Sequence, residues 1–189
     1  MRNPIRPVRS ALALASTLLG VPLAARKLAR RVGHPILYRI ALPEAAEIHE
    51  EPGLLSARTD DLVVVVVARD LLHDEANPVP AAAPARRRLT RLLMNSDLLL
   101  FVLLEEEFRN RNRNLKLHDA VSRVRALGGQ WAACVHGRLE ENGRSGWIDI
   151  HATVKDGILY MLVFTMSGGD PGAHEELLAR IRDSLVLPG

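Results

Sequence analysis

Apolar and polar residues alternate along much of the C-terminal half of the chain, at the period of two that is typical of β-strands. Three such stretches follow one another at residues 130–140, 145–154 and 158–166. The links between them are Asn142-Gly143 and Asp156-Gly157, which favour type I′ turns because both central residues of that turn need a positive φ. The pattern therefore predicts an antiparallel meander of three strands.

Shorter apolar runs precede the meander. The five consecutive valines at residues 63–67 form a β-branched run without alternation, which is typical of a strand buried on both faces. Residues 36–42, stopped by Pro43, and residues 54–58, which follow a turn, predict two further strands. Residues 115–127 alternate imperfectly, but they are expected to form a strand that leads into a double glycine.

Helical patterns separate and follow these strands. One helix is expected to begin near Pro84, and residues 98–104 are an apolar run that suits a buried helix or a buried strand, with a helix preferred. A last helix should begin at Asp170-Pro171, because Asp caps helix N-termini and Pro fits the first helical position. Its apolar residues form a stripe that should dock on the sheet: Leu177, Leu178, Ile181 and Leu185. Together the elements predict an α+β sandwich in which an antiparallel sheet is flanked by helices.

Residues 1–33 form a basic and apolar segment ahead of a single domain expected at residues 34–189. The 15 apolar or small residues at positions 11–25 have basic residues on both sides. This layout is typical of a secretory signal, and the run is shorter than the about 20 residues that a spanning helix needs. Because no good cleavage site follows, a membrane anchor, an organelle transit segment and an ordinary basic helix stay open as alternatives.

The net charge of +3 is distributed unevenly along the chain. Residues 1–42 carry eight basic and no acidic side chains, which leaves 17 basic and 22 acidic side chains, a net charge of −5, in the remainder. The domain itself therefore lacks the basic surface that nucleic-acid binding requires, and no nucleic acid is expected as a partner. A single cysteine, Cys134, excludes an internal disulfide.

The meander predicts which side chains share a face. If Asn142 and Gly143 form the loop of the first hairpin, His136 lies opposite Asp149 and Cys134 lies opposite His151. One face should then carry the following residues: Cys134, His136, Arg138, Trp147, Asp149 and His151. The same reasoning at the next turn places four more residues beside them: Tyr160, Leu162, Phe164 and Met166.

This polar face has three interpretations. Cys134, His136, Asp149 and His151 have the donor types of a zinc site or of a cysteine nucleophile with its base. The sequence has no local ligand pair of the CxxC or HxxxH kind, and a flat strand supplies no pair of oxyanion donors. We therefore expect no catalytic residues, metal or cofactor. Trp147, Tyr160 and Phe164 should form a half-buried floor that contacts a protein partner. The candidate binding residues are His136, Trp147, Asp149, His151 and Tyr160.

The order of these elements resembles the PsbP-like fold. The resemblance spans residues 36–187 and rests on the strand entry LGGQW, the strand DGILYML and the closing helix that ends in Ser184-Leu185. This group includes the PsbP proteins of photosystem II, Ran-binding Mog-type proteins and the LpqN-type lipoproteins of actinobacteria. The resemblance implies a non-enzymatic binding or accessory module, and it carries over no active-site residue. The chain lacks the anchoring cysteine of the lipoprotein members.

The function expected from the sequence is a non-enzymatic binding or accessory module at the cell envelope. Its partner is expected to be a protein, and residues 1–33 would export the chain or attach it to the membrane. One alternative is a cytoplasmic protein-interaction module of the same fold. The other is a small metal- or cysteine-dependent enzyme that uses Cys134, His136, Asp149 and His151.

Overall fold

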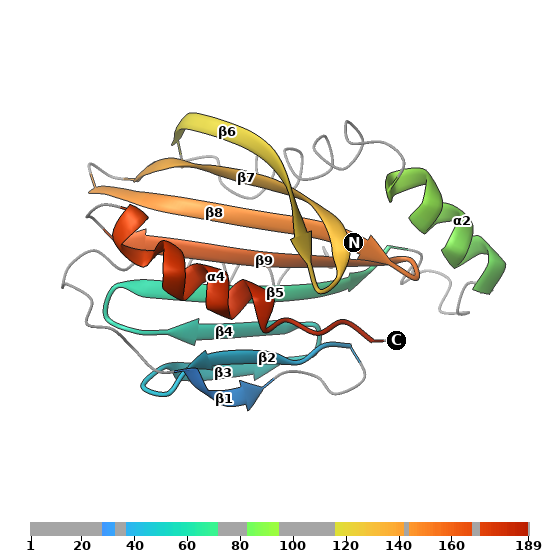
Figure 1. Cartoon of the computed structure of the whole chain (residues 1–189), viewed down its shortest axis with the longest axis horizontal. Helices are drawn as coiled ribbons and strands as arrows, with labels where there is room; N and C mark the ends of the chain where they lie inside the picture. Colours follow the sequence, from blue (N-terminus) through green and yellow to red (C-terminus); the bar gives the residue numbers. More distant parts are fainter. Residues whose placement is uncertain are drawn as a thin grey trace, which may run out of the picture.

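The computed structural model describes residues 28–32, 37–71, 83–94, 116–141, 144–167 and 171–188. Most of these residues form a seven-stranded antiparallel sheet with the spatial order β3-β4-β5-β9-β8-β7-β6 (Figure 1). Its strands are β3 (Glu47–Glu51), β4 (Leu54–Arg58), β5 (Leu62–Asp70), β6 (Lys116–Leu127), β7 (Gln130–Glu141), β8 (Arg144–Lys155) and β9 (Ile158–Ser167). A separate antiparallel ribbon consists of β1 (Leu28–Val32) and β2 (Ile40–Pro43).

The predicted meander is confirmed, with the predicted register. His136 pairs with Asp149 and Cys134 pairs with His151 across β7 and β8. At the turn between β8 and β9, Asp156 and Gly157 have φ values of 51° and 76°, as a type I′ turn requires. The loop residues Asn142 and Gly143 lie outside the described residues.

The valine-rich strand β5 lies at the centre of the sheet, between β4 and β9, and six of its nine residues are buried. Its side chains divide between the two faces, since Val63, Val65 and Val67 join one apolar cluster while Val64 and Val66 join the other. The prediction of a strand buried on both faces is therefore confirmed.

Helices occupy two places around the sheet (Figure 1). The helix α4 (Glu175–Asp183), preceded by the 3₁₀ helix η1 (Pro171–His174), packs on one face through Leu178 and Ile181. The helix α2 (Ala83–Met94) lies at the end of the sheet, where Gly157 donates a backbone hydrogen bond of 2.8 Å to Thr90 Oγ1. The expectation that helices flank the sheet thus holds in part: α4 covers a face and α2 lies beside a turn.

Several predicted boundaries need correction. The first predicted strand begins at Ile40, four residues later than expected, and it includes Pro43, which pairs with Leu28 of β1. Strand β3 was not predicted, because its polar sequence EIHEE lacks an apolar pattern and four of its five residues are exposed. The last helix begins with a 3₁₀ turn, so regular α-helix starts only at Glu175. Residues 98–104 and Asp170 lie outside the described residues.

Strand β1 falls within the segment at residues 1–33 that was predicted to precede the domain. It pairs with β2 from Val32↔Ile40 to Leu28↔Pro43, with one irregularity near Leu28. The proposed division between residues 33 and 34 stays a prediction. Among the described residues, no helix has the length and apolar character needed to cross a membrane.

Much of the face of the sheet under α4 is buried. Tyr160, Leu162 and Phe164 of β9 are each at most 1% exposed, and they pack with Leu178 and Ile181 of the helix. The alternation that was predicted to build a polar face is correct, but the helix and the strand β2 turn that face into a core layer. The polar side chains that were predicted for this face therefore lie beneath α4 or at its margin.

Candidate functional site

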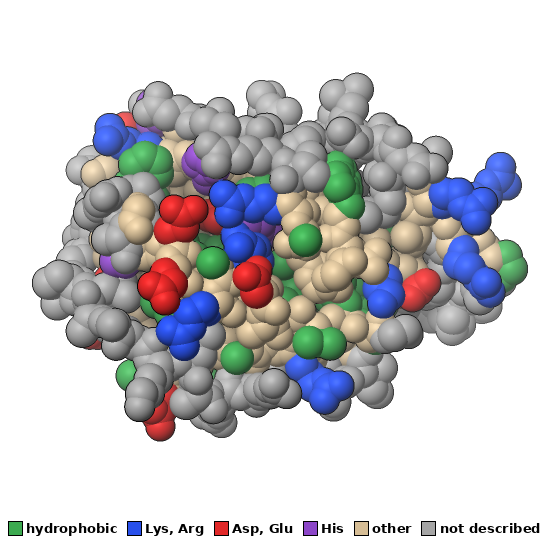
Figure 2. All heavy atoms as spheres, in the orientation of Figure 1, with side chains coloured by type: hydrophobic (Ala, Val, Ile, Leu, Met, Phe, Trp, Pro, Cys, Tyr) green, Lys and Arg blue, Asp and Glu red, His purple; other side chains and the backbone are tan. Residues whose placement is uncertain are grey.

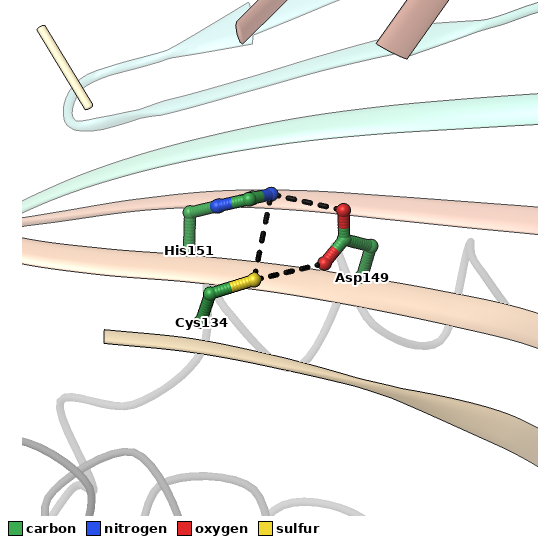
Figure 3. Close-up of side chains that lie close together, drawn as sticks. All are labelled: Cys134, Asp149 and His151. Carbon is green, nitrogen blue, oxygen red and sulfur yellow. Dashed lines mark hydrogen bonds and ion pairs between the residues drawn. The ribbon is translucent and has the colours of Figure 1, made fainter. Parts of the chain in front are cut away.

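Three polar side chains meet inside this layer, and we call Cys134, Asp149 and His151 the polar triad (Figure 3). Cys134 Sγ donates to Asp149 Oδ1 at 3.2 Å, and His151 Nε2 lies 2.9 Å from Asp149 Oδ2. The third side of the triangle joins Cys134 Sγ to His151 Nε2 at 3.9 Å. The carboxylate of Asp149 thus accepts two hydrogen bonds when the thiol and Nε2 both carry a proton.

The triad arises directly from the strand register. Cys134 of β7 pairs with His151 of β8, and Asp149 lies two residues before His151, on the same face of the sheet. Both strands are in the interior of the sheet, so their neighbours fix the backbone on each side. The ring of His151 also packs edge-on against Phe164, with 6.0 Å between ring centroids.

Burial and charge set the protonation states of the triad. Burial, followed by the charge and the hydrogen bond of Asp149, raises the pKa of the Cys134 thiol well above its ordinary value, although Arg125 and Arg182 lower it. Burial raises the pKa of Asp149, but the hydrogen bond and charge of His151, together with the hydrogen bond of Cys134 and the charge of Arg125, outweigh this effect and hold the pKa below its usual value. The group is therefore a protonated thiol beside a carboxylate, which is the opposite of an activated cysteine.

A pocket of about 310 Å³ opens beside the triad, between the sheet and one side of α4. Asp149 belongs to both the triad and the pocket wall, and its side chain keeps 17% exposure. The other lining residues come from four strands and both C-terminal helices: Arg125, His136, Trp147, Ile148, Met166, Gly172, Glu175, Leu178 and Arg182. The pocket thus combines an apolar floor with charged groups on its rim.

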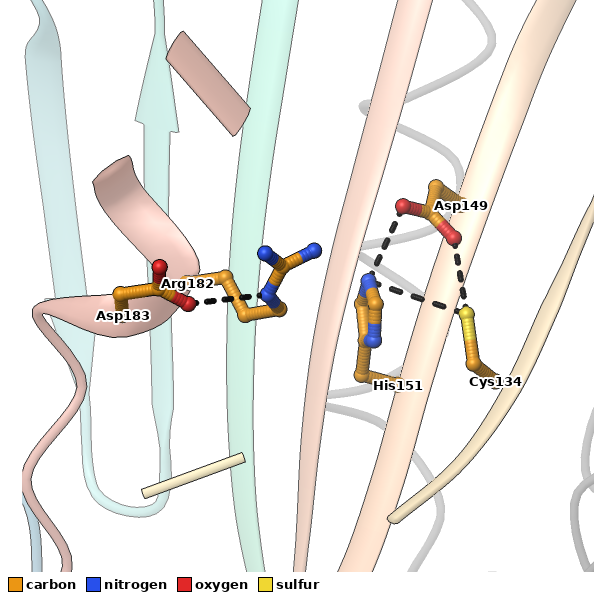
Figure 4. Close-up of polar contacts among 5 residues, drawn as sticks. All are labelled: Cys134, Asp149, His151, Arg182 and Asp183. Carbon is orange, nitrogen blue, oxygen red and sulfur yellow. Dashed lines mark hydrogen bonds and ion pairs between the residues drawn. The ribbon is translucent and has the colours of Figure 1, made fainter. Parts of the chain in front are cut away.

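Two arginines bring positive charge to this pocket. Arg182 extends from α4 with its guanidinium end pointing toward the polar triad, while its Nε donates to Asp183 Oδ1 at 3.1 Å (Figure 4). Arg125 enters from β6 and lines the same space. On the surface over α4, acidic and basic side chains alternate (Figure 2). The pocket mouth is therefore a mixed-charge surface.

Trp147 lies at the margin of the pocket and contacts a cation on its other side. The guanidinium carbon of Arg138 lies 5.7 Å from the centroid of the Trp147 ring, within the range of a cation–π contact. The two residues pair across β7 and β8, as the hairpin register predicted. This contact limits the orientations open to an indole that is only partly buried.

The five candidate binding residues separate into two groups. His136, Trp147 and Asp149 line the pocket and are partly exposed. His151 and Tyr160 are 0% and 1% exposed. A half-buried floor was predicted from Trp147, Tyr160 and Phe164, and this is wrong for Tyr160 and Phe164, because α4 packs over them.

Sequence reasoning missed the arginines and Glu175 as members of this site. Arg125 pairs with Ala132 close to the Gly128-Gly129 turn, so the reasoning applied to the other two turns would also have placed Arg125 on the face of Cys134. Arg182 lies four residues after Leu178, so the helical period places it near the docking stripe. That signal was available once the stripe had been identified.

The sequence matches no protein-family model, and no curated protein matches it significantly. The fold does have relatives among solved structures. The cyanobacterial PsbP protein CyanoP of Synechocystis sp. PCC 6803 superposes with a TM-score of 0.50 at 13% identity, over 90% of this chain and 99% of that one. The chain has the PsbP-like fold.

Other structures with lower scores are similar to this PsbP-like chain. LpqN of Mycobacterium tuberculosis, a protein involved in cell envelope biogenesis, gives a TM-score of 0.46 at 12% identity, covering 84% of this chain and 90% of LpqN. A putative regulator of Pseudomonas aeruginosa gives a TM-score of 0.43 at 14% identity, and the match covers 85% of this chain and 97% of the regulator. The superposition on CyanoP confirms the predicted resemblance to the PsbP-like fold, and an identity of 13% carries the fold alone.

Proposed function

We propose that this PsbP-like chain is a non-enzymatic binding module that contacts a protein partner through the pocket beside α4. The observation that carries the proposal is the convergence of His136, Trp147 and Arg182 on one concave site. Tryptophan and arginine are enriched at the energetic centres of protein interfaces, because each combines a large contact area with hydrogen-bonding or charged groups. Glu175 and Arg125 give the site charges of both signs, which favours a partner with complementary charges.

The state of the single cysteine supports a non-catalytic role. Cysteine enzymes require a thiolate, which is stabilised by a nearby positive charge and remains accessible to substrate. Cys134 is 1% exposed and its nearest charged neighbour is the carboxylate of Asp149. The alternative function, an enzyme centred on the triad, predicts a turnover that Cys134→Ala abolishes.

The contact site can be tested by photocrosslinking in the cells that produce the protein. A benzoylphenylalanine at Glu175, an exposed residue of the pocket wall, should crosslink to a discrete protein, whereas the same group at Glu47 on β3 should not. Arg182→Glu should abolish the crosslink. Arg180→Glu, the same charge reversal outside the pocket wall on the same helix, should leave it intact.

The folding of each variant should be checked by circular dichroism and thermal unfolding. Equal crosslinking in the Arg182→Glu and Arg180→Glu variants would show that the pocket is not the contact site. A crosslink from Glu47 alone would move the interface to the opposite edge of the sheet.

The proposed location is the cell envelope, supported by the basic and apolar pattern of residues 1–33. We expect a tagged chain to fractionate with membranes or exported protein. A variant with Leu18→Asp and Leu19→Asp, which interrupts the apolar run, should remain in the cytosol. If the unaltered chain is also cytosolic and keeps Met1, the cytoplasmic module is the correct alternative.

A further inference from the structure

The polar triad contains three different metal-ligating groups within one small volume. The thiol of Cys134, a carboxylate oxygen of Asp149 and Nε2 of His151 all lie within 4.8 Å of one another. They come from β7 and β8, so the sheet holds their backbones in a fixed relation. The sequence has no CxxC or HxxxH pair because these ligands come together across two strands and not through local spacing within one element.

The separations between the ligand atoms resemble those around a tetrahedral zinc ion. With bonds of about 2.3 Å to sulfur and about 2.0–2.2 Å to nitrogen and oxygen, tetrahedral angles place the ligand atoms about 3.4–3.6 Å apart. Cys134 Sγ lies 3.9 Å from His151 Nε2, and the Asp149 carboxylate lies 3.2 Å from the sulfur through Oδ1 and 2.9 Å from the nitrogen through Oδ2. Each distance differs from the tetrahedral value by about 0.5 Å or less. A rotation of the Asp149 carboxylate must still bring one of its oxygens to the ion together with the sulfur and the nitrogen.

We propose that Cys134, Asp149 and His151 bind a zinc ion. Thiolate and imidazole ligands favour Zn²⁺ over Mg²⁺ and Ca²⁺, which prefer all-oxygen sites. Asp149 borders the pocket, so the ion has an entry path, and a water molecule or a donor from the pocket's occupant completes the fourth position. The inference goes beyond the proposed binding function and does not depend on it.

The loaded site balances its charges. Binding releases the thiol proton and the Nε2 proton of His151 to solvent, so that Zn²⁺ is held by a thiolate, a carboxylate and a neutral imidazole that is protonated at Nδ1. These charges sum to zero, which limits the repulsion from Arg125 and Arg182. His151 Nδ1 is buried and has no hydrogen-bond partner in the described part of the chain, so the ring gives up no existing contact at that atom.

Cobalt substitution tests the proposal directly on the purified full chain without a histidine tag. Tetrahedral Co²⁺ bound to a thiolate gives a near-ultraviolet charge-transfer band and visible bands. Because the chain has only one cysteine, any thiolate–cobalt band must come from Cys134. We expect one equivalent of Co²⁺ to bind, Zn²⁺ to displace it, and one equivalent of zinc by mass spectrometry of the protein.

Ligand variants provide the matched comparison. Cys134→Ala and His151→Gln should weaken zinc binding more than about 100-fold, since even the loss of an outer-sphere contact costs 10–100-fold. His49→Gln, at an exposed histidine on β3, should bind zinc as the unaltered chain does. The absence of a thiolate–cobalt band in the unaltered chain overturns the proposal whether or not the variants fold. Equal zinc binding by the Cys134→Ala variant would overturn it as well.

Discussion

At the scale of single residues, the inner face of the sheet contains polar atoms that burial separates from water. Tyr160 is 1% exposed and its hydroxyl has no hydrogen-bond partner in the described ranges. Thr153 is equally buried, but its hydroxyl donates to the carbonyl of Trp131 at 2.6 Å. A hydrogen bond thus compensates the desolvation of the Thr153 hydroxyl, whereas the described residues offer no such compensation to the Tyr160 hydroxyl.

The two tyrosines of the chain should ionise only at a pH above the ordinary range for tyrosine. Burial, with the charge of Asp156, raises the pKa of Tyr160 to about 12, and burial with Glu50 raises the pKa of Tyr38 further. Absorbance at 295 nm should therefore show little tyrosinate in the native protein at pH 10.5, and about 1.5 tyrosinates per chain after unfolding in guanidinium chloride, because each of the two tyrosines is then about three-quarters ionised. Ionisation of either tyrosine near pH 10 in the native protein would contradict its burial.

The same shift makes stability depend on alkaline pH. Because the native-state pKa of Tyr160 is raised above the unfolded value of 10, its contribution is complete below pH 10 and is lost as the pH rises toward 12. A pKa shift of about two units corresponds to a contribution of at most about 3 kcal/mol to the free energy of unfolding. The free energy of unfolding should fall less steeply over this interval in Tyr160→Phe than in the unaltered chain.

Removing the two hydroxyls should have opposite effects at neutral pH. Tyr160→Phe deletes an uncompensated hydroxyl and should leave the free energy of unfolding unchanged or raise it by up to about 1 kcal/mol. Thr153→Val leaves the Trp131 carbonyl without this donor and should lower it by about 1–2 kcal/mol. Denaturant unfolding at pH 7 measures both. A loss in Tyr160→Phe as large as that in Thr153→Val would mean that the Tyr160 hydroxyl is bonded.

At the scale of elements, turn chemistry and apolar period predict more than polarity does. The dipeptides Asn142-Gly143 and Asp156-Gly157, with the alternation around them, predict the register of the meander and which residues share each face. Strand β3 escapes prediction because its cross-strand hydrogen bonds to β4, and not its exposed side chains, hold it in the sheet. The helix α4 was expected to dock, but the depth at which it buries Tyr160 and Phe164 depends on packing across the sheet, which no local pattern encodes.

The double glycine at the turn between β6 and β7 offers a matched pair. Gly128 and Gly129 have φ values of +55° and +76°, so alanine strains the backbone at either position. A Cβ at Gly128 would lie 2.6 Å from Leu187 Cγ, whereas one at Gly129 would meet nothing within 4 Å. Gly129→Ala should lower the free energy of unfolding by about 1 kcal/mol. Gly128→Ala should lower it by about 1–3 kcal/mol more, because the added Cβ overpacks the site.

Chemical denaturation of the two alanine variants measures the difference. Equal losses would mean that Leu187 moves aside freely, and the contact between the C-terminal segment and this turn would then contribute little. Leu187 is 6% exposed and belongs to the cluster under α4, so a free displacement would also have to open that cluster.

At the scale of the whole molecule, the segment after α4 joins three parts of the structure that are distant in sequence. Ser184 Oγ accepts a hydrogen bond from the backbone N–H of Ala41 at 2.9 Å, next to strand β2's first residue. Val186 exchanges two backbone hydrogen bonds with Arg39, of 3.0 and 2.8 Å. Leu185 and Leu187 enter the core under the helix. The ribbon of β1 and β2, the helix and the large sheet should therefore unfold as one unit.

Val186→Pro tests this coupling, because proline removes the N–H that donates to the carbonyl of Arg39. The side chain of Val186 is 52% exposed, so Val186→Ala serves as a control that should change the free energy of unfolding by less than about 0.5 kcal/mol. The proline variant should lose about 1–3 kcal/mol, and hydrogen exchange should speed up at Ile40 and Leu42 as well as at Ile181. If exchange rises at Val186 and Arg39 alone, the bridge is a local contact, and α4 holds its place over the polar triad by apolar packing.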